Sequence, residues 1–578
     1  MEEFATSQSA RSGGSSGRSW LSQALHNKII ALVLAMIVAV PLFAAPADYS
    51  LTGIAALTLE TGALLLLTML LWRAKWDLRP EQLRTFAATS ANLPLLLFLG
   101  WVTLSCVLAP QKIFSIQYLL QVGAGAMLYF AVAYQFRQSK HLSLLTDVLL
   151  LLALVVSIGG LAQYQLYDEV RASALFGNAQ PLGSFVMLLL PMIAALAIGD
   201  KNAKRQVVAQ ITVVLMVGCL LLTQGRSAWL GSLAGLAVLA LLASRGAEKL
   251  EEKSRQRKRV AEGSALSWKT RKAQLVLPGL LAVIALGFVF TMNSQNASVV
   301  QRASTLSQLG GDASWQGRVQ EHWQGGLAMI AQRPLTGWGA GQFPFYQKSF
   351  THMGVEISPL GTGTRVSLAE QAHNFYLQTA AELGLIGLGL MLAVLGCFWM
   401  AAWRRIPEME AGIRRTLLMA SAAASVGFAV DAFGSPSWQY AQNSMFLWLI
   451  LGVGTSCLRP RLRPEPEAIV QLRAPSRRVT WLARPAAVGL FLMTSSLLPT
   501  AYGAAQSFNY NPEPPKKPKK PKKPKKNNGD DVFRVLFGVG AITAAGYAIH
   551  GLFVAGDKKK DKDENPPLWF LKENREGM

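Results

Sequence analysis

The stretch "HNFYLQTAAELGLIGLGLMLAVLGCFWM", residues 373–400, decides the fold class. It opens on polar side chains and from Phe375 onward stays almost wholly apolar for longer than the roughly 20 residues that a helix needs to cross a membrane. Comparable apolar runs recur at about 29–46, 51–72, 93–109, 114–136, 142–165, 182–199, 207–223, 228–243, 275–292, 416–434 and 444–458. The sequence therefore predicts an all-α polytopic membrane protein with about twelve transmembrane helices, one or two of them broken or re-entrant at Gly or Pro.

The composition supports a membrane protein. The 578 residues are 51% hydrophobic and only 15% charged, whereas soluble proteins average roughly 25% charged residues. The four cysteines lie in or beside apolar runs without the spacing of a metal site, so they are expected to act as small hydrophobic residues. They are Cys106, Cys219, Cys397 and Cys457.

The net charge of +23 is concentrated in alternate loops. Basic residues gather near 73–84, 137–140, 201–205, 244–274, 404–405 and 459–478, whereas the short loops between hold only Lys112, Arg171 and Arg226. Because basic loops stay on the cytoplasmic side, the N-terminus and residue 460 are expected inside and residues 293–372 outside. The alternation argues against nucleic acid as a partner.

The chain divides into a membrane core and a terminal extension. The expected parts are a disordered cytoplasmic N-terminus (1–27), the transmembrane core (28–460), a basic cytoplasmic linker (461–484) and the extension (485–578). The extension holds two more apolar runs, about 485–504 and 533–555, on either side of a Pro/Lys-rich linker at 511–527 that cannot pack a core. Whether these two runs cross the membrane stays open.

The outer segment, 293–372, contains one helical pattern and one glycine-rich stretch. Trp315, Val319, Trp323, Leu327 and Ile330 recur at helical spacing and predict an amphipathic helix at the membrane interface or against the bundle. The stretch "LTGWGAGQFPF" follows as a turn. It does not qualify as a nucleotide-binding loop, because no strand precedes it.

Three polar features converge on the outer face and could perform chemistry. His373 and its neighbours Glu370, Gln371 and Asn374 precede an apolar helix, and a neutral imidazole held by such groups can accept a proton. A lone interfacial histidine is more often structural.

Arginines supply the other two features. Arg226 lies in a short connection, where an arginine can also simply reach toward the interface, and Arg318 lies in the outer segment with Arg302 upstream. The guanidinium fork binds phosphate oxygens in pairs, which suits a lipid-linked diphosphate.

The stretch "HNFYLQTAAELGLIG" resembles the O-antigen ligase signature, in which H-[NSQ] is followed by nine residues and then G-x-x-[GTY]. His373 and Asn374 open the match, and Gly384 and Gly387 close it. The stretches "FGNAQPLGSFVMLLLP", "TQGRSAWLG" and "RPLTGWGAGQF" are similar to further segments of this family. The resemblance covers roughly residues 30–460 and leaves the extension out.

The resemblance implies a multi-helix fold of the GT-C type in the bacterial inner membrane, with a large periplasmic segment that bears the active site. It implies transfer of a glycan from an undecaprenyl-diphosphate carrier without metal or cofactor. Arg226 matches the family's short-loop arginine and Arg318 is chosen as its large-loop arginine, with Arg302 as the competitor.

The acceptor and the class of activity remain open. Lipid A core would make the protein an O-antigen ligase, another lipid-linked glycan a polymerase, and a protein hydroxyl an oligosaccharyltransferase; the signature favours the ligase. A polysaccharide transporter or flippase is the alternative from another class. It would use ionisable residues inside the bundle, for which Glu60, Asp147 and Asp431 are candidates.

Overall fold

The computed structural model describes residues 26–42, 51–74, 91–166, 171–258, 318–350 and 371–459. These residues form helices and no strand, which confirms the predicted all-α class for this part of the chain. A helix at His26–Leu42 is followed by α2 (Leu51–Ala74), α4 (Asn92–Leu108), α5 (Lys112–Gln135), α6 (Ser139–Leu166), α7 (Ala179–Gly199), α8 (Ala203–Leu222), α9 (Arg226–Lys258), α13 (Gln324–Gln332), α14 (Phe343–Phe350), α15 (Phe375–Arg405), α16 (Ile413–Asp431) and α17 (Ala441–Leu458).

Eight of the described helices are long and apolar enough to cross a membrane, and three shorter apolar helices accompany them. All of these coincide with predicted apolar runs. The run at 275–292 and the extension from residue 460 lie outside the described residues, so the total of about twelve spans stays a prediction.

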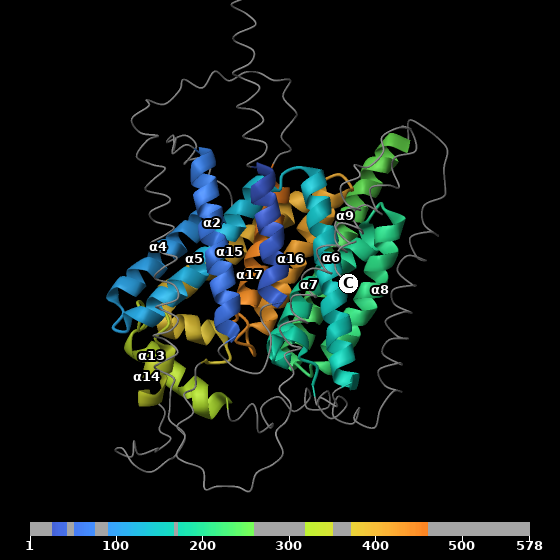
Figure 1. The fold of residues 1–578 in the computed structure, drawn as a ribbon. Helices are drawn as coiled ribbons and strands as arrows, with labels where there is room; N and C mark the ends of the chain where they lie inside the picture. The colour runs from blue at the N-terminus through green and yellow to red at the C-terminus, as the bar shows by residue number, and fades with distance from the viewer. Residues whose placement is uncertain are drawn as a thin grey trace, which may run out of the picture.

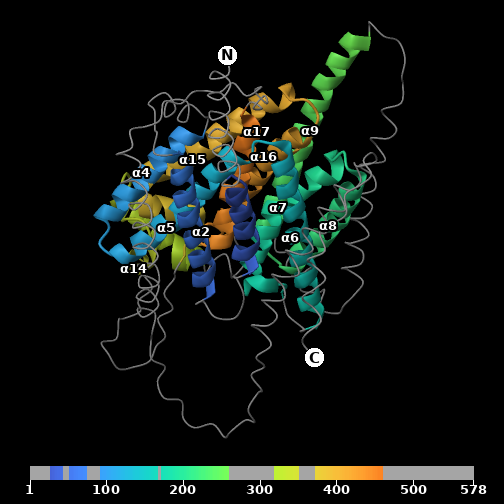
Figure 2. The ribbon, with the colours of Figure 1, turned by 45° about the horizontal axis from the view of Figure 1, so that its top comes forward.

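The bundle is centred on α16 and α17, which the N-terminal helices and α6 to α9 surround (Figures 1 and 2). Small residues allow α9 and α16 to approach each other closely. A Cβ atom on Gly231 would come within 2.6 Å of the Gly427 carbonyl oxygen, so any larger side chain would push these helices apart.

The helix α15 is broken at Gly384, where φ is 70° and ψ is −179°. The break redirects Leu385 N to Pro334 O and Ile386 N to Leu335 O, so the carbonyls of Ala381 and Glu382 lose their helical donors. Donors from elsewhere bond these two carbonyls and that of Leu383. Trp338 N donates to Ala381 O at 3.0 Å, Gly339 N to Glu382 O at 2.8 Å, and Trp101 Nε1 to Leu383 O at 2.8 Å. The glycine-rich loop thus inserts into the opened turn of α15.

The other side of this loop docks on the turn between α4 and α5. Ser115 Oγ donates to Ala340 O at 2.6 Å, and Gln342 Nε2 donates to Gln111 O at 2.9 Å. The loop is therefore fixed on both flanks, and residues 334–342 form a turn, as the sequence predicts.

The predicted amphipathic helix is present over residues 319–332, but the side chains that pack against the protein differ in part from the predicted stripe. Val319–Trp323 is a π-helical turn that leads into α13. A π turn contains one extra residue, which rotates all later side chains by about 100° about the axis. Leu327 of the predicted stripe is 59% exposed and so is not packed against the bundle, while Met329 packs into the apolar cluster with Phe343 and Ala372.

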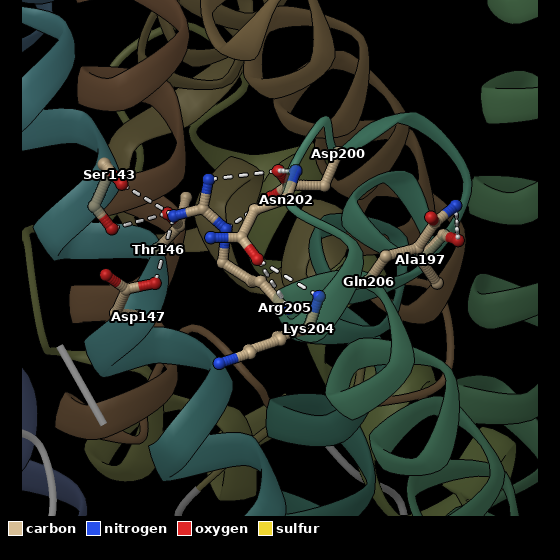
Figure 3. A network of polar contacts seen from close by, with 9 residues as sticks. All are labelled: Ser143, Thr146, Asp147, Ala197, Asp200, Asn202, Lys204, Arg205 and Gln206. Carbon is tan, nitrogen blue, oxygen red and sulfur yellow. Dashed lines mark hydrogen bonds and ion pairs between the residues drawn. The ribbon is translucent and has the colours of Figure 1, made fainter. Parts of the chain in front are cut away.

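At the end of the bundle opposite α13, a buried network joins α6 to the turn between α7 and α8 (Figure 3). Arg205 Nη1 donates to Ser143 Oγ at 2.6 Å and to Asp147 Oδ1 at 3.1 Å, and both carboxylate oxygens of Asp200 accept from the same guanidinium. Asn202 caps α8 beside it. Since breaking a buried pair leaves an uncompensated charge, this network locks the local packing.

Candidate active site

Arg226 is the first residue of α9 and directly follows the tight turn at residues 223–225. The turn is strained at Gln224, which has a φ of 52°. Trp229 holds it down, because its Nε1 donates to Leu220 O at 2.9 Å. The "TQGRSAWLG" stretch therefore encodes a compact helical hairpin that sets Arg226 at its tip.

Arg171 lies against the same turn, although it comes from the segment that precedes α7. Its Nε donates to Thr223 O at 2.8 Å, and Ala172 N donates to Leu222 O at 3.0 Å. The segment then enters α7 through Gly177, which has a φ of 63°, and Asn178, whose Oδ1 accepts from Gln180 N at 2.9 Å. The "FGNAQ" stretch is thus a turn and a helix cap.

Arg318 reaches the same place from the outer segment. Its Nη1 donates to Gly434 O at 2.8 Å, in the turn that follows α16. Arg171, Arg226 and Arg318 line one small cavity of about 60 Å³. Its other lining residues are Gln180, Gln224, Gly225, Ser227 and Gly434. Two predicted arginines therefore share one concavity, and its lining residues have polar side chains or are glycine.

The turn at 431–434 connects this cavity to the histidine. Gly434 O accepts from Arg318, while Ala432 O accepts from Phe375 N at 2.9 Å, at the first residue of α15. Asp431 anchors the turn, because its Oδ2 accepts from Ser184 Oγ at 2.7 Å and from Ser437 Oγ at 2.6 Å. A single turn, anchored by the buried Asp431, thus holds both Arg318 and the start of the histidine helix.

His373 precedes α15 in a left-handed conformation, with a φ of 51°. Its ring lies 5.5 Å from the ring of His322, centroid to centroid. Its Nδ1 is buried and has no hydrogen-bond partner among the residues that the structure describes. A non-glycine residue at positive φ is uncommon and is often found at functional sites.

The surroundings of His373 keep its imidazole neutral. Burial, the positive charge of Arg318 and the proximity of His322 together lower the pKa of His373 to about 4 from the ordinary value of 6.5, with burial the largest cause. At neutral pH the ring is therefore neutral and can accept a proton, although the lowered pKa makes it a weak base.

The remaining predicted site residues divide into two groups. Asn374 caps α15, since its Oδ1 accepts from Leu377 N at 3.0 Å, and Gln371 is half-buried in the chain before it. Glu370 and Arg302 lie outside the described residues. Asn374 therefore has a structural task that its place in the signature does not reveal, and the competition between Arg302 and Arg318 is not decided.

Two further residues lie at this site that the sequence does not identify as site residues: Arg171 lines the cavity, and His322 lies beside His373. In the sequence Arg171 is only one of three basic residues in short outer loops, and His322 lies within the helical pattern of the outer segment. The only sequence signal for Arg171 is its basic charge in a short outer loop. No local pattern marks His322.

Within the described part of the chain, no three His, Cys, Asp or Glu side chains gather as a metal site would require. Residues 211–392 match the protein-family model described as O-antigen ligase. This range includes Arg226, Arg318, His322 and His373, but not Arg171 or Asp431. No curated protein matches the sequence.

Proposed function

Through residues 211–392 the chain belongs to the O-antigen ligase-like superfamily, and on this premise we propose that it transfers a glycan from an undecaprenyl-diphosphate carrier to an acceptor hydroxyl on the periplasmic face of the inner membrane. The observation that supports this most strongly is the cavity lined by Arg171, Arg226 and Arg318, one of which lies close enough to His373 to lower its pKa. Positive charge and a proton acceptor are the two requirements of this reaction.

The arginines act on the leaving group in this proposal. Three guanidinium groups around one concavity favour a ligand with several negative oxygens, and a diphosphate is the simplest one attached to a lipid. As the bond between the anomeric carbon and the phosphate oxygen breaks, negative charge grows on the diphosphate. Groups already aimed at that charge lower the barrier without reorganising.

His373 acts on the acceptor. The acceptor oxygen attacks the anomeric carbon, and its proton passes to the neutral imidazole. Donor binding assists this step, because a diphosphate that pairs with Arg318 cancels part of the positive charge that depresses the pKa of His373. The histidine thus becomes a better base when the donor is in place.

The acceptor is proposed to be lipid A core, which makes the protein an O-antigen ligase. A polymerase that extends a lipid-linked glycan, or a protein oligosaccharyltransferase, would use the same arginines and histidine and differ only in the acceptor. In each of these three cases the protein is surrounded by membrane lipids.

A transporter or flippase is less well supported by the buried acids. Asp147 pairs with Arg205, and Asp431 accepts hydrogen bonds from Ser184 and Ser437. Both acids therefore have fixed local partners, which suits a static bundle better than a moving one. Glu60 is also buried, in α2.

The test is surface lipopolysaccharide from a deletion strain complemented with wild type or with His373→Ala. A ligase is expected to leave polymeric glycan on its lipid carrier and bare core in the variant. Single repeats on finished core would indicate a polymerase instead. Loss of carrier-linked glycan from the outer leaflet would favour transport and contradict the proposal.

A further inference from the structure

The π-helical turn at Val319–Trp323 places two functional side chains on one side of the outer segment. In a π turn, residues about four to five positions apart share a face. Arg318 and His322 have this spacing. Arg318 meets the cavity through Gly434, and His322 meets the ring of His373. Single π turns inside helices occur frequently at functional sites.

The same turn also fixes the backbone that leads into His373. Trp323 Nε1 donates to Ala372 O at 3.0 Å, one residue before the histidine. The two imidazole rings are then 5.5 Å apart between centroids and tilted by 39°. His322 is half-buried. The charged and titratable groups that the structure places around His373 are Arg318 and His322.

We infer that His322 is a second imidazole of this site, a positioning residue that holds the ring of His373 and takes the transferred proton on from it. This inference rests on the proposed function. An imidazolium at His373 would be buried beside a guanidinium, and passing the proton to a second ring would relieve that repulsion. Two adjacent imidazoles share one proton much more readily than they hold two.

The reaction balances with His322 included. The acceptor oxygen forms its bond to the anomeric carbon, and the bond from that carbon to the phosphate oxygen breaks. The bonding electrons leave with the lipid diphosphate. The hydroxyl proton moves to His373, then to His322, and from there to water, so both rings end neutral and no oxidant or reductant is needed.

The experiment measures glycan transfer by the purified full-length protein in lipid, with undecaprenyl-diphosphate-linked glycan as donor. His322→Phe keeps an aromatic ring but cannot accept a proton, and it is expected to lower kcat by about 10- to 100-fold with an unchanged donor KM. Imidazole added to His322→Ala is expected to restore part of the rate. Gln324→Ala, an exposed neighbour, is the control and should match wild type.

His322→Phe with wild-type kcat, or a folded His322→Ala that imidazole does not rescue, would overturn the inference. A purely structural role would be restored by Phe and unaffected by imidazole. His373→Ala and wild type are measured in parallel, so the two proposals can fail separately. If wild type and His373→Ala transfer equally, the proposed function fails and the role of His322 fails with it; if only the His322 variants behave as wild type, the proposed function stands.

Discussion

His373 is the residue whose environment departs most from that of an ordinary surface histidine. It is held at positive φ, its Nδ1 is buried, and its pKa is lowered to about 4. A residue that merely lined a helix end would require none of these features. The lowered pKa belongs to the protein without donor, which makes the pH dependence of kcat/KM the relevant observable.

Transfer should therefore tolerate acid better than an ordinary histidine base would allow. Burial and neighbouring positive charge disfavour the protonated ring, so the reactive neutral form persists until the pH approaches the lowered pKa. We expect kcat/KM to stay level from about pH 7 to about pH 5 and to fall only below that range. A half-maximal loss near the ordinary value of 6.5 would contradict the assigned environment.

Substitution of Arg171 tests the proposed role of the cavity in donor binding. Its Nε bond to Thr223 O and its place in the cavity predict that Arg171→Ala raises the donor KM by roughly 10- to 100-fold, the effect of losing a charged hydrogen bond. Arg171→Lys should recover only part of the loss, because an ammonium lacks the bidentate fork. Lys112→Ala removes the same charge from an exposed lysine outside the cavity and should leave KM unchanged.

The sequence alone identifies only part of this set of candidate site residues. Arg226 and His373 were identifiable because each lies in a short stretch with its own local pattern. Arg318 was a weaker choice, and the structure places it beside both. Arg171 and His322 could not be found, since their positions depend on a docked turn and on a π turn that hydrophobic periodicity does not encode.

Among the helices, the break in α15 explains why the loop with Gly337 and Gly339 lies against the segment that contains Gly384. Gly384 opens the helix, and the loop with Gly337 and Gly339 fills the opening with its own donors. A Cβ atom on Gly384 would lie 2.0 Å from Leu335 O. The apolar run predicts a spanning helix correctly, but the run itself cannot tell a straight helix from one that receives a loop.

Gly384→Ala should therefore destabilise the protein by about 2–5 kcal/mol, because it adds left-handed strain and a backbone clash. Gly389→Ala, on the same helix with open space around it, should be neutral or stabilising. Thermal unfolding in detergent compares the two. Equal melting temperatures would mean that the loop does not insert at Gly384.

At the scale of the whole molecule, the arginine cavity and the Arg205 network lie at opposite ends of the bundle. The alternation of basic loops predicts that the cavity end faces the periplasm and the Arg205 end faces the cytoplasm. The apolar runs predict the helical class, and the alternation of basic loops predicts this orientation. Neither pattern predicts which helices form the centre, because α16 and α17 are no more apolar than their neighbours and owe their position to small-residue packing.

Single cysteines in a cysteine-free background test the orientation. Leu335→Cys replaces an exposed residue near the break in α15, and Glu410→Cys replaces an exposed residue in the connection before α16. A membrane-impermeant maleimide should label the first in intact cells and the second only after the membrane is opened. The reverse order would place the cavity in the cytoplasm, out of reach of an exported donor.

The most direct measurement separates donor binding from transfer in the purified protein. Radiolabelled undecaprenyl-diphosphate glycan is supplied with lipid A core to wild type, His373→Ala and Arg226→Ala. The account predicts that His373→Ala binds donor normally but transfers at least about 100-fold more slowly, whereas Arg226→Ala fails to bind the donor. Transfer by His373→Ala at the wild-type rate would contradict it.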